Sequence, residues 1–247
     1  MDTLPTAGAT IENQTLDGFG WGEADLTDAV FHNCLIADAP FGAVTLEGAR
    51  FYRCRILRGR FARADLRDTL FEDCSFADPE AHAGLSLAYS RLDQAVFRRC
   101  DLSFSKIESC EMHGVTLEDC NLRGAQFQRN DFTRNLGRYR SSAAATLRRC
   151  NFHLADLSDI KLPGCDLAQS LFREADLSGA NLEGADLRDT DLFGAITSGA
   201  KLAGADLRGA EISGLDLTAL ASRDGLKITA DQQYALLSAL GIAVSVD

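Results

Sequence analysis

The chain has 247 residues, and 25 Lys and Arg against 36 Asp and Glu give a formal net charge of −11. Hydrophobic residues make up 46% of the sequence, which argues against intrinsic disorder. The acidic balance argues against direct nucleic-acid binding, which needs clustered Lys and Arg. Met1–Ala9 lacks the basic and apolar segments of a signal peptide, and no apolar run is long enough to span a membrane. We therefore expect a cytoplasmic protein with reduced cysteines and no membrane contact.

A five-residue repeat runs along the chain, as in ADLSG ANLEG ADLRD TDLFG from Ala175 onward. Every fifth residue is large and apolar, and we call it the centre of its repeat; the residue two positions before it is small. The centres form three blocks, from Leu26 to Phe76, from Leu87 to Phe132 and from Leu147 to Leu217. Weaker repeats before Leu26 predict an N-terminal cap over residues 1–23.

A period of five fits neither an α-helix nor a flat strand, but it fits a chain that turns a corner at every repeat. The centre and the small residue then both face inward. Glycine follows many centres by two positions and supplies the positive φ of a type II turn. We expect corners without glycine, such as Asp68, Asp159 and Asp189, to use another turn type.

The A-[D/N]-L-x-x signature resembles the pentapeptide repeat family over roughly four-fifths of the chain. The resemblance implies an all-β fold, a right-handed quadrilateral β-helix in which four repeats make one coil. We assign residues 24–217 to this β-helix. Two loops interrupt it, and a short C-terminal α-helix plus strand follows it.

All eight cysteines lie two positions before a centre, at the small inward position. We expect them to act as small apolar core residues. The alternative is a thiol-based metal or redox site, but the sequence has no CxxC pair, and an inward ladder offers poor tetrahedral geometry. We therefore expect no metal and no cofactor. We also expect no catalytic residues, because no side chains pair as nucleophile and base. The cysteines are Cys34, Cys54, Cys74, Cys100, Cys110, Cys120, Cys150 and Cys165.

Two interruptions break the repeat. Loop one, residues 77–86 (ADPEAHAGLS), shifts the phase of the centres by one residue. Loop two, residues 133–145 (TRNLGRYRSSAAA), keeps the phase and is rich in arginine. Such loops can be tolerated insertions at a corner, but long loops in a compact fold are more often functional.

The third block of repeats is acidic, because Asp often precedes its centre. We expect these carboxylates to project outward at regular spacing. They form either a surface that imitates the phosphate rows of duplex DNA or a solvated face that prevents edge-to-edge association. The candidates for the DNA-like face are Asp156, Asp166, Asp176, Asp186, Asp191 and Asp206.

The repeats end near Leu217, and residues 218–247 follow another pattern. Thr229 and Gln232 match a capping box, which predicts a helix over Gln232–Leu240 that Gly241 ends. Ile242, Val244 and Val246 alternate as a short strand. Because an open β-helix end exposes unpaired backbone groups, we expect this module to cap the end or to pair with a second copy.

The tail sequence DQQYALLSALGIAV resembles the C-terminal dimerisation module of the quinolone-resistance pentapeptide repeat proteins, the Qnr family. The positions of the two loops also resemble the Qnr layout. The resemblance implies a homodimer whose interface contains Leu236, Leu237, Leu240, Ile242 and Val244. It further implies a non-enzymatic DNA mimic that binds DNA gyrase or topoisomerase IV. The implied result is protection from poisons such as fluoroquinolones or natural gyrase toxins.

The resemblance also assigns partner-binding residues by position. In loop one these are Asp78, Glu80 and His82. In loop two they are Arg134, Arg138, Tyr139, Arg140 and Ser141. The alternative function is a non-enzymatic interaction scaffold whose partner is not a topoisomerase.

Overall fold

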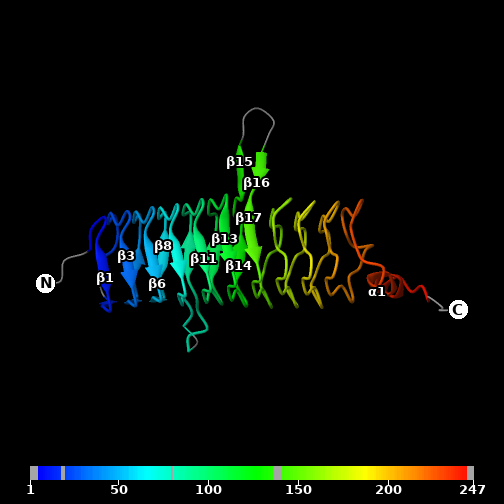
Figure 1. Cartoon of the computed structure of the whole chain (residues 1–247), viewed down its shortest axis with the longest axis horizontal. Coiled ribbons are helices and arrows are strands. Elements are labelled where there is room, and N and C mark those ends of the chain that lie inside the picture. The colour runs from blue at the N-terminus through cyan, green and yellow to red at the C-terminus, as the bar shows by residue number, and fades with distance from the viewer. Residues whose placement is uncertain (1–4, 18–19, 79, 136–140, 244–247) are drawn as a thin grey trace.

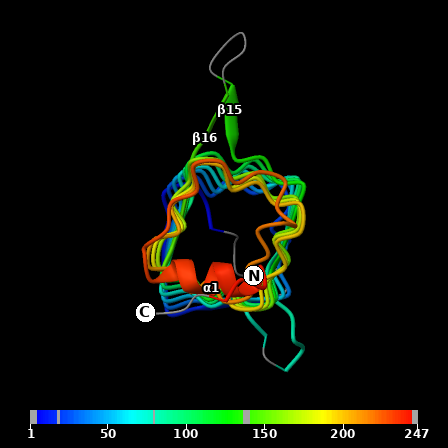
Figure 2. The same cartoon turned by 90° about the vertical axis from the view of Figure 1, so that its right-hand side faces the viewer.

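Each five-residue repeat forms one side of a square coil, and successive coils stack into a rod (Figures 1 and 2). The computed structural model describes residues 5–17, 20–78, 80–135 and 141–243. The four sides of a coil belong to four faces of the rod, which we number in chain order from the face that contains Thr10. The predicted quadrilateral β-helix is confirmed.

Three faces contain strands that pair in parallel with strands of the neighbouring coils. Face 1 is a sheet of β1 (Thr10–Glu12), β3 (Val30–His32), β6 (Arg50–Tyr52), β9 (Leu70–Glu72), β11 (Val96–Arg98), β13 (Val115–Glu118) and β17 (Ala145–Arg148). Face 2 contains β2 (Thr15–Asp17), β4 (Leu35–Ala37) and β7 (Arg55–Leu57). Face 3 contains β5 (Pro40–Phe41), β8 (Arg60–Ala62), β10 (Ser86–Ala88), β12 (Lys106–Glu108) and β14 (Gln126–Gln128). Face 4 is joined by isolated bridges such as Asp25–Thr45 and Lys161–Asn181.

The register between coils is regular except at the loops. Paired residues are 20 positions apart in most of the rod, as in the pairing of β3 with β6. Loop one widens the spacing to 26 positions, since Arg60 pairs with Ser86. Loop two widens it to 30 positions, since Val115 pairs with Ala145. The ladder survives both insertions because the extra residues leave the coil at a corner.

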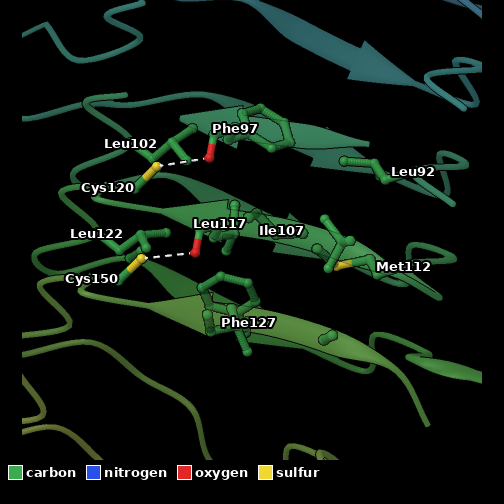
Figure 3. Packing of buried hydrophobic residues seen from close by; sticks show 14 of the residues in the cluster. Leu92, Phe97, Leu102, Ile107, Met112, Leu117, Cys120, Leu122, Phe127 and Cys150 are labelled. Atoms are coloured by element: carbon green, nitrogen blue, oxygen red, sulfur yellow. Dashed lines mark hydrogen bonds between the residues drawn. The ribbon is translucent and has the colours of Figure 1, made fainter. Parts of the chain in front are cut away.

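The centres of the repeats fill the interior of the rod, as predicted. Aromatic centres stack from coil to coil, with ring centroids 4.5 Å apart for Phe31 and Phe51 and 4.3 Å apart for Phe41 and Phe61. Aliphatic centres continue these rows around Phe97 (Figure 3). The rows bury the apolar surface of each coil against the next, which is the main source of stability.

All eight cysteines are free and buried at the small inward position, in agreement with the prediction that they pack as core residues. Each thiol of one column donates a weak hydrogen bond to a carbonyl oxygen of the preceding coil. The distance is 3.3 Å from Cys120 to Phe97 and from Cys150 to Leu117 (Figure 3). The column contains Cys34, Cys54, Cys74, Cys100, Cys120 and Cys150.

The backbone conformation at the corners differs from one expectation about turn type. Corners without glycine also have positive φ, with values of 56° at Asp68, 56° at Asp159 and 57° at Asp189 against 69° at Gly48. A left-handed conformation costs a residue with a side chain roughly 1–2 kcal/mol. The ladder offsets this cost, since the corner N–H of Asp159 donates to the carbonyl oxygen of Ser178 at 2.8 Å.

The β-helix extends further at both ends than the sequence pattern predicts. β1 pairs with β3, so the residues assigned to a cap already form the first coil. At the other end the ladder continues beyond Leu217, where Lys201 pairs with Ser222 and Asp206 with Lys227. The spacing there is 21 positions, and this single inserted residue ends the five-residue period without ending the coil.

The C-terminal segment forms α1 (Gln232–Ala239), which confirms the predicted helix. The predicted strand after it is not found at Ile242, which has no strand pairing within the described residues, and Val244 and Val246 lie outside them.

Loop two forms a hairpin of β15 (Thr133–Asn135) and β16 (Ser141–Ala143). In the part of the chain that the structure describes, no helix has the length and apolar character needed to cross a membrane.

Burial of the thiols makes their reactivity a test of the packing. We expect a thiol reagent such as DTNB to leave the native protein nearly unmodified, because each sulfur lies inside the rod. In denaturant without reductant, eight thiols per chain are expected to react. Fewer than eight in denaturant would reveal disulfides, and fast reaction of the native protein would contradict the packed column.

Candidate functional site

Loop one leaves the rod at the corner between faces 2 and 3 and is held at its first residues. Asp78 and Ala83 form an antiparallel bridge across the base of the loop. The Asp78 carboxylate accepts hydrogen bonds from the Ala81 N–H at 3.2 Å and from the Arg58 guanidinium at 2.7 Å. These two interactions, the Ala81 bond first, lower the pKa of Asp78. Asp78, expected to bind a partner, therefore anchors the loop.

The returning half of loop one is held by the next coil. The His82 ring packs edge-on against Phe104, with centroids 5.9 Å apart, and the Leu85 N–H donates to the Ser105 hydroxyl at 3.1 Å. Gly84 lies so close to this coil that a Cβ atom would approach the Ser105 backbone nitrogen to 2.6 Å. The loop is clamped on both sides, and it exposes Glu80 and His82.

Loop two leaves the rod at the corner between faces 4 and 1, on the opposite side from loop one (Figure 2). The Asp131 carboxylate accepts hydrogen bonds from the Thr133 N–H at 2.8 Å and hydroxyl at 2.6 Å, which fixes the start of β15. Arg134 is exposed on β15, and Ser141 begins β16. The other expected contact residues of this loop, Arg138, Tyr139 and Arg140, lie outside the described residues.

Two grooves flank the base of the hairpin, a feature that the sequence did not indicate. One, of about 550 Å³, lies where Asp131 and Lys161 face each other across the root of loop two. The other, of about 560 Å³, lies on face 4 and is lined by charged residues that include Arg91 and Arg134. Asp131 and Thr133 line both grooves, where the hairpin begins.

The six aspartates expected to form one acidic face lie on three faces. Asp166, Asp186 and Asp206 follow one another on face 1. Asp191 lies on face 2, and the remaining two, Asp156 and Asp176, lie on face 3. The spacing along the sequence hid this division, because repeats five residues apart belong to adjacent sides of the coil.

Four of these six carboxylates are paired with arginine. Asp186 and Asp206 accept bonds from the arginines two residues later, at 2.6 Å to Arg188 and 2.7 Å to Arg208. Asp166 lies 3.5 Å from Arg148, and Asp191 pairs with Arg173. Exposed pairs of this kind add little stability, but they neutralise the charge that faces 1 and 2 present.

An Asp that directly precedes a centre also stabilises the turn that follows it. Its carboxylate accepts the N–H of the residue two positions later, at 3.1 Å in Asp156–Ser158 and 2.8 Å in Asp176–Ser178. This side-chain-to-backbone bond holds the turn. The acidity of the repeat is therefore partly a consequence of the fold.

Face 3 differs from the other faces between residues 146 and 217 because its charges are all negative. Asp156, Asp176 and Asp216 precede its centres, and Glu174 and Asp159 lie at its two corners. The bases of this stretch lie on the other faces or at the corner between faces 1 and 2. They are Arg148, Arg149, Lys161, Arg173, Arg188, Lys201 and Arg208. We call the five carboxylates the acidic surface of face 3.

Helix α1 covers the end of the rod. The Gln232 amide is buried and donates to the carbonyl oxygens of Leu207 and Ala210, both at 2.7 Å, while its oxygen accepts from the Thr229 N–H at 2.7 Å. Thr229 and Gln232 are thus in contact, but the predicted capping box is not formed, because Asp231 is the N-cap of the helix and no side chain caps it. The Gln232 side chain also satisfies carbonyl groups of the last coil.

The residues expected to form a dimer interface divide into two groups. Leu236 is only 6% exposed and belongs to the core, so it closes the rod. Leu237 is half-buried, whereas Leu240 and Ile242 are 42% and 49% exposed. Tyr234, which no pattern in the sequence marked as an interface residue, is 60% exposed on the same helix. Val244 lies outside the described residues.

Two thiols outside the column, Cys110 and Cys165, lack the features of a reactive group. Burial raises the pKa of Cys110 and of Cys165 to about 11, which keeps these thiols protonated at neutral pH. Across the described ranges, no group of three or more His, Cys, Asp or Glu side chains has a geometry that could hold a metal ion.

Comparison with known proteins relates these features to other chains. The family model for pentapeptide repeats matches residues 110–135, 150–189 and 185–219. The quinolone resistance pentapeptide repeat protein QnrB96 of Scandinavium goeteborgense is 28% identical over 127 residues, and the pentapeptide repeat protein QnrB4 of Escherichia coli is 27% identical over 127 residues. Each match covers 51% of this chain and 57% of the relative, so just over half of each relative's length is matched.

Two solved structures of trypsin-treated QnrB1 variants, described as a plasmid-mediated fluoroquinolone resistance protein, have the same fold. Their TM-scores are 0.75 and 0.69, at 23% and 24% sequence identity. Each alignment covers 96% of this chain, and 100% and 99% of the two QnrB1 chains.

The Asp206–Arg208 pair predicts a measurable titration. The hydrogen bond from Arg208 lowers the pKa of Asp206 from its ordinary 3.8 to about 2. Because the folded pKa lies below the unfolded one, the pair stabilises the protein above about pH 4, and this contribution is lost as pH falls toward 2. In Arg208→Gln, we expect carboxyl-detected NMR titration to give an Asp206 pKa nearer its ordinary value.

The matched control for this titration is Arg188→Gln, which removes the partner of Asp186 and leaves the Asp206 pKa low. An unchanged Asp206 pKa in Arg208→Gln would show that the pair does not form in solution.

Proposed function

We propose that this chain is a Qnr-like pentapeptide repeat protein and that it binds a type II topoisomerase, DNA gyrase or topoisomerase IV. Binding protects the enzyme from poisons such as fluoroquinolones or natural gyrase toxins. The observation that carries the proposal is the similarity to quinolone resistance proteins, together with a rod that has two projecting loops. The protein acts as a binding factor and not as an enzyme.

The acidic surface of face 3 is the part of the rod that imitates DNA in this proposal. Enzymes that hold duplex DNA present basic surfaces to rows of phosphates. Asp156 and Asp176 are stacked on successive coils of a straight rod, in the stretch of face 3 between residues 146 and 217 that has no base, and so offer a comparable negative field. The paired aspartates of faces 1 and 2 contribute less, because arginines compensate them.

The two loops provide contacts beyond the acidic surface. Loop one presents Glu80 and His82 from a base that Arg58 and Phe104 hold in place. The hairpin of loop two projects from the other side of the rod (Figure 2), and its strand β15 contains the exposed Arg134. Clamped or hydrogen-bonded loops bind with a smaller loss of conformational entropy than free ones.

Homodimerisation through the C-terminal end completes the proposal. Tyr234, Leu240 and Ile242 form an exposed apolar group at the end of the rod. A two-fold dimer would bury this group against its own copy, and such dimers are the commonest closed assemblies. The two rods would then continue one another and double the length of the DNA-like surface.

A gyrase assay tests the main proposal. We expect the purified protein to restore DNA supercoiling by gyrase in the presence of a fluoroquinolone and to reduce drug-induced cleavage. Asp156→Asn/Asp176→Asn should need about fivefold more protein for the same effect, since two charges are lost while the amide still accepts the turn hydrogen bond.

The matched control is Asp166→Asn/Asp186→Asn, which removes equal charge from face 1 and should differ little from the unaltered protein. Equal loss in both variants would indicate that total charge matters and the face does not. No effect of the unaltered protein on gyrase would favour a scaffold with another partner.

The dimer interface is tested by Leu240→Asp/Ile242→Asp. Both side chains are exposed in the single chain, so their replacement should leave the fold intact while charge repulsion opposes the two-fold contact. Light scattering after size exclusion should change from twice the chain mass to the chain mass. Tyr89→Asp, at an exposed position on the side of the rod, should leave the dimer unchanged. A dimeric double variant would rule out this interface.

A further inference from the structure

The exposed apolar side chains of the rod are concentrated on one edge. Among the described residues outside the C-terminal segment, five large apolar side chains are exposed; three of them, Leu154, Phe193 and Ile196, lie around the corner between faces 2 and 3, and Leu171 lies on face 2. The exposed fractions are 47% for Leu154, 44% for Leu171, 49% for Phe193 and 53% for Ile196. The fifth, Tyr89, lies at the corner between faces 3 and 4.

The ladder brings three of these residues together at the edge between faces 2 and 3. Phe193 follows a centre of face 2, and Ile196 precedes the next centre on face 3, so the two flank the corner at Gly194. Leu154 occupies the same corner two coils earlier. At a coil spacing of about 4.8 Å, the three span about 10 Å along the rod.

The same edge leads back to loop one. The corner N–H groups of Phe104, Gly124, Leu154 and Glu174 each donate to the next coil, so these residues form one column. The Phe104 ring lies over Gly124, where an added Cβ would be 3.1 Å from the ring. Phe104 also contacts His82 of loop one. A line of apolar side chains, interrupted by Gly124 and Glu174, therefore runs from the base of loop one to Ile196.

Neither packing nor backbone preference explains the large residues on this line. Leu154 has a φ of 59°, a conformation that glycine adopts without strain, and glycine occupies this corner at positions 124, 194 and 214. Half of the Leu154 surface remains in water, so burial recovers only part of that cost. The ladder offsets this cost at the other corners without glycine as well, so it is the exposure of a large apolar side chain that points to a role outside the fold.

Phe193 is held in a fixed orientation. The Arg173 guanidinium lies over its ring, 5.4 Å from the centroid, and the same guanidinium pairs with Asp191. An aromatic ring held by a cation–π contact is a pre-organised anchor, because little rotamer freedom is lost when a partner covers it.

The charges around this apolar line specify its partner. Glu174 lies within the line, and the acidic surface of face 3 borders it on one side. On the other side, Arg173 is already paired with Asp191. The complementary surface has an apolar centre and basic residues on the side that meets face 3.

We propose that the edge between faces 2 and 3, formed by Phe104, Leu154, Phe193 and Ile196, is the apolar anchor of the partner contact. Its occupant is a protein surface that carries basic residues around exposed apolar side chains. The inference rests on the proposed function, in which that protein is the topoisomerase. Beyond that function, the inference states that loop one and this edge bind one continuous patch of the partner.

Equilibrium binding of the full-length protein to purified DNA gyrase tests the inference. Phe193→Ser/Ile196→Ser should weaken binding at least tenfold, because residues at the centre of an interface carry most of its affinity. Leu154→Asn should weaken it about threefold or more, since asparagine tolerates the left-handed corner without supplying apolar contact. The loss should persist at high salt, unlike a loss caused by removing carboxylates.

Tyr89→Ser is the matched control, an exposed ring at a corner with a φ of 54° on another edge, and it should change binding less than twofold. Melting temperature and oligomeric state should be the same for all variants. If the unaltered protein binds gyrase and the double variant binds equally well, this inference fails and the proposed function stands. If the unaltered protein does not bind, both fail. If the double variant becomes monomeric, the edge belongs to a second copy, which also overturns the inference.

Discussion

The parallel hydrogen-bond ladder between coils is the constraint on which the rest of this structure depends. Each side of a coil pairs with the side 20 residues earlier and the side 20 residues later, so its backbone groups are satisfied only in that register. Extra residues cannot stay in the coil without breaking this pairing. They leave at a corner, as in loop one and loop two, and they project from a rod that is otherwise uniform (Figure 1).

Because of the same constraint, the residues that stabilise the core and the residues that form the surface occupy different positions of each repeat. Inward positions accept apolar or small residues, whereas the outward positions of each repeat are free to vary. Asp before a centre is favoured because its carboxylate bonds to the turn, so acidity alone says little about function. Between residues 146 and 217, cations lie among the carboxylates of faces 1 and 2, whereas face 3 carries none.

The positions of the two loops limit how a partner can bind. They leave from opposite sides of the rod, so one flat surface cannot contact both on the same protomer (Figure 2). A partner that contacts both must be concave, or the two loops must serve different parts of it. The apolar edge lies in line with loop one and borders face 3. Loop one, this edge and the acidic surface of face 3 therefore lie on one side of the molecule.

The sequence by itself determined what depends on local periodicity: the coil, the inward cysteines, the two loops and the helix over Gln232–Ala239. Only the tertiary structure decided which outward residues share a face, because that depends on the register between residues 20 to 30 positions apart. It divided the six aspartates among three faces and paired four of them with arginine. It buried Leu236 at the end of the rod and brought Leu154, Phe193 and Ile196 onto one edge, because stacking, and not sequence distance, sets which side chains are neighbours.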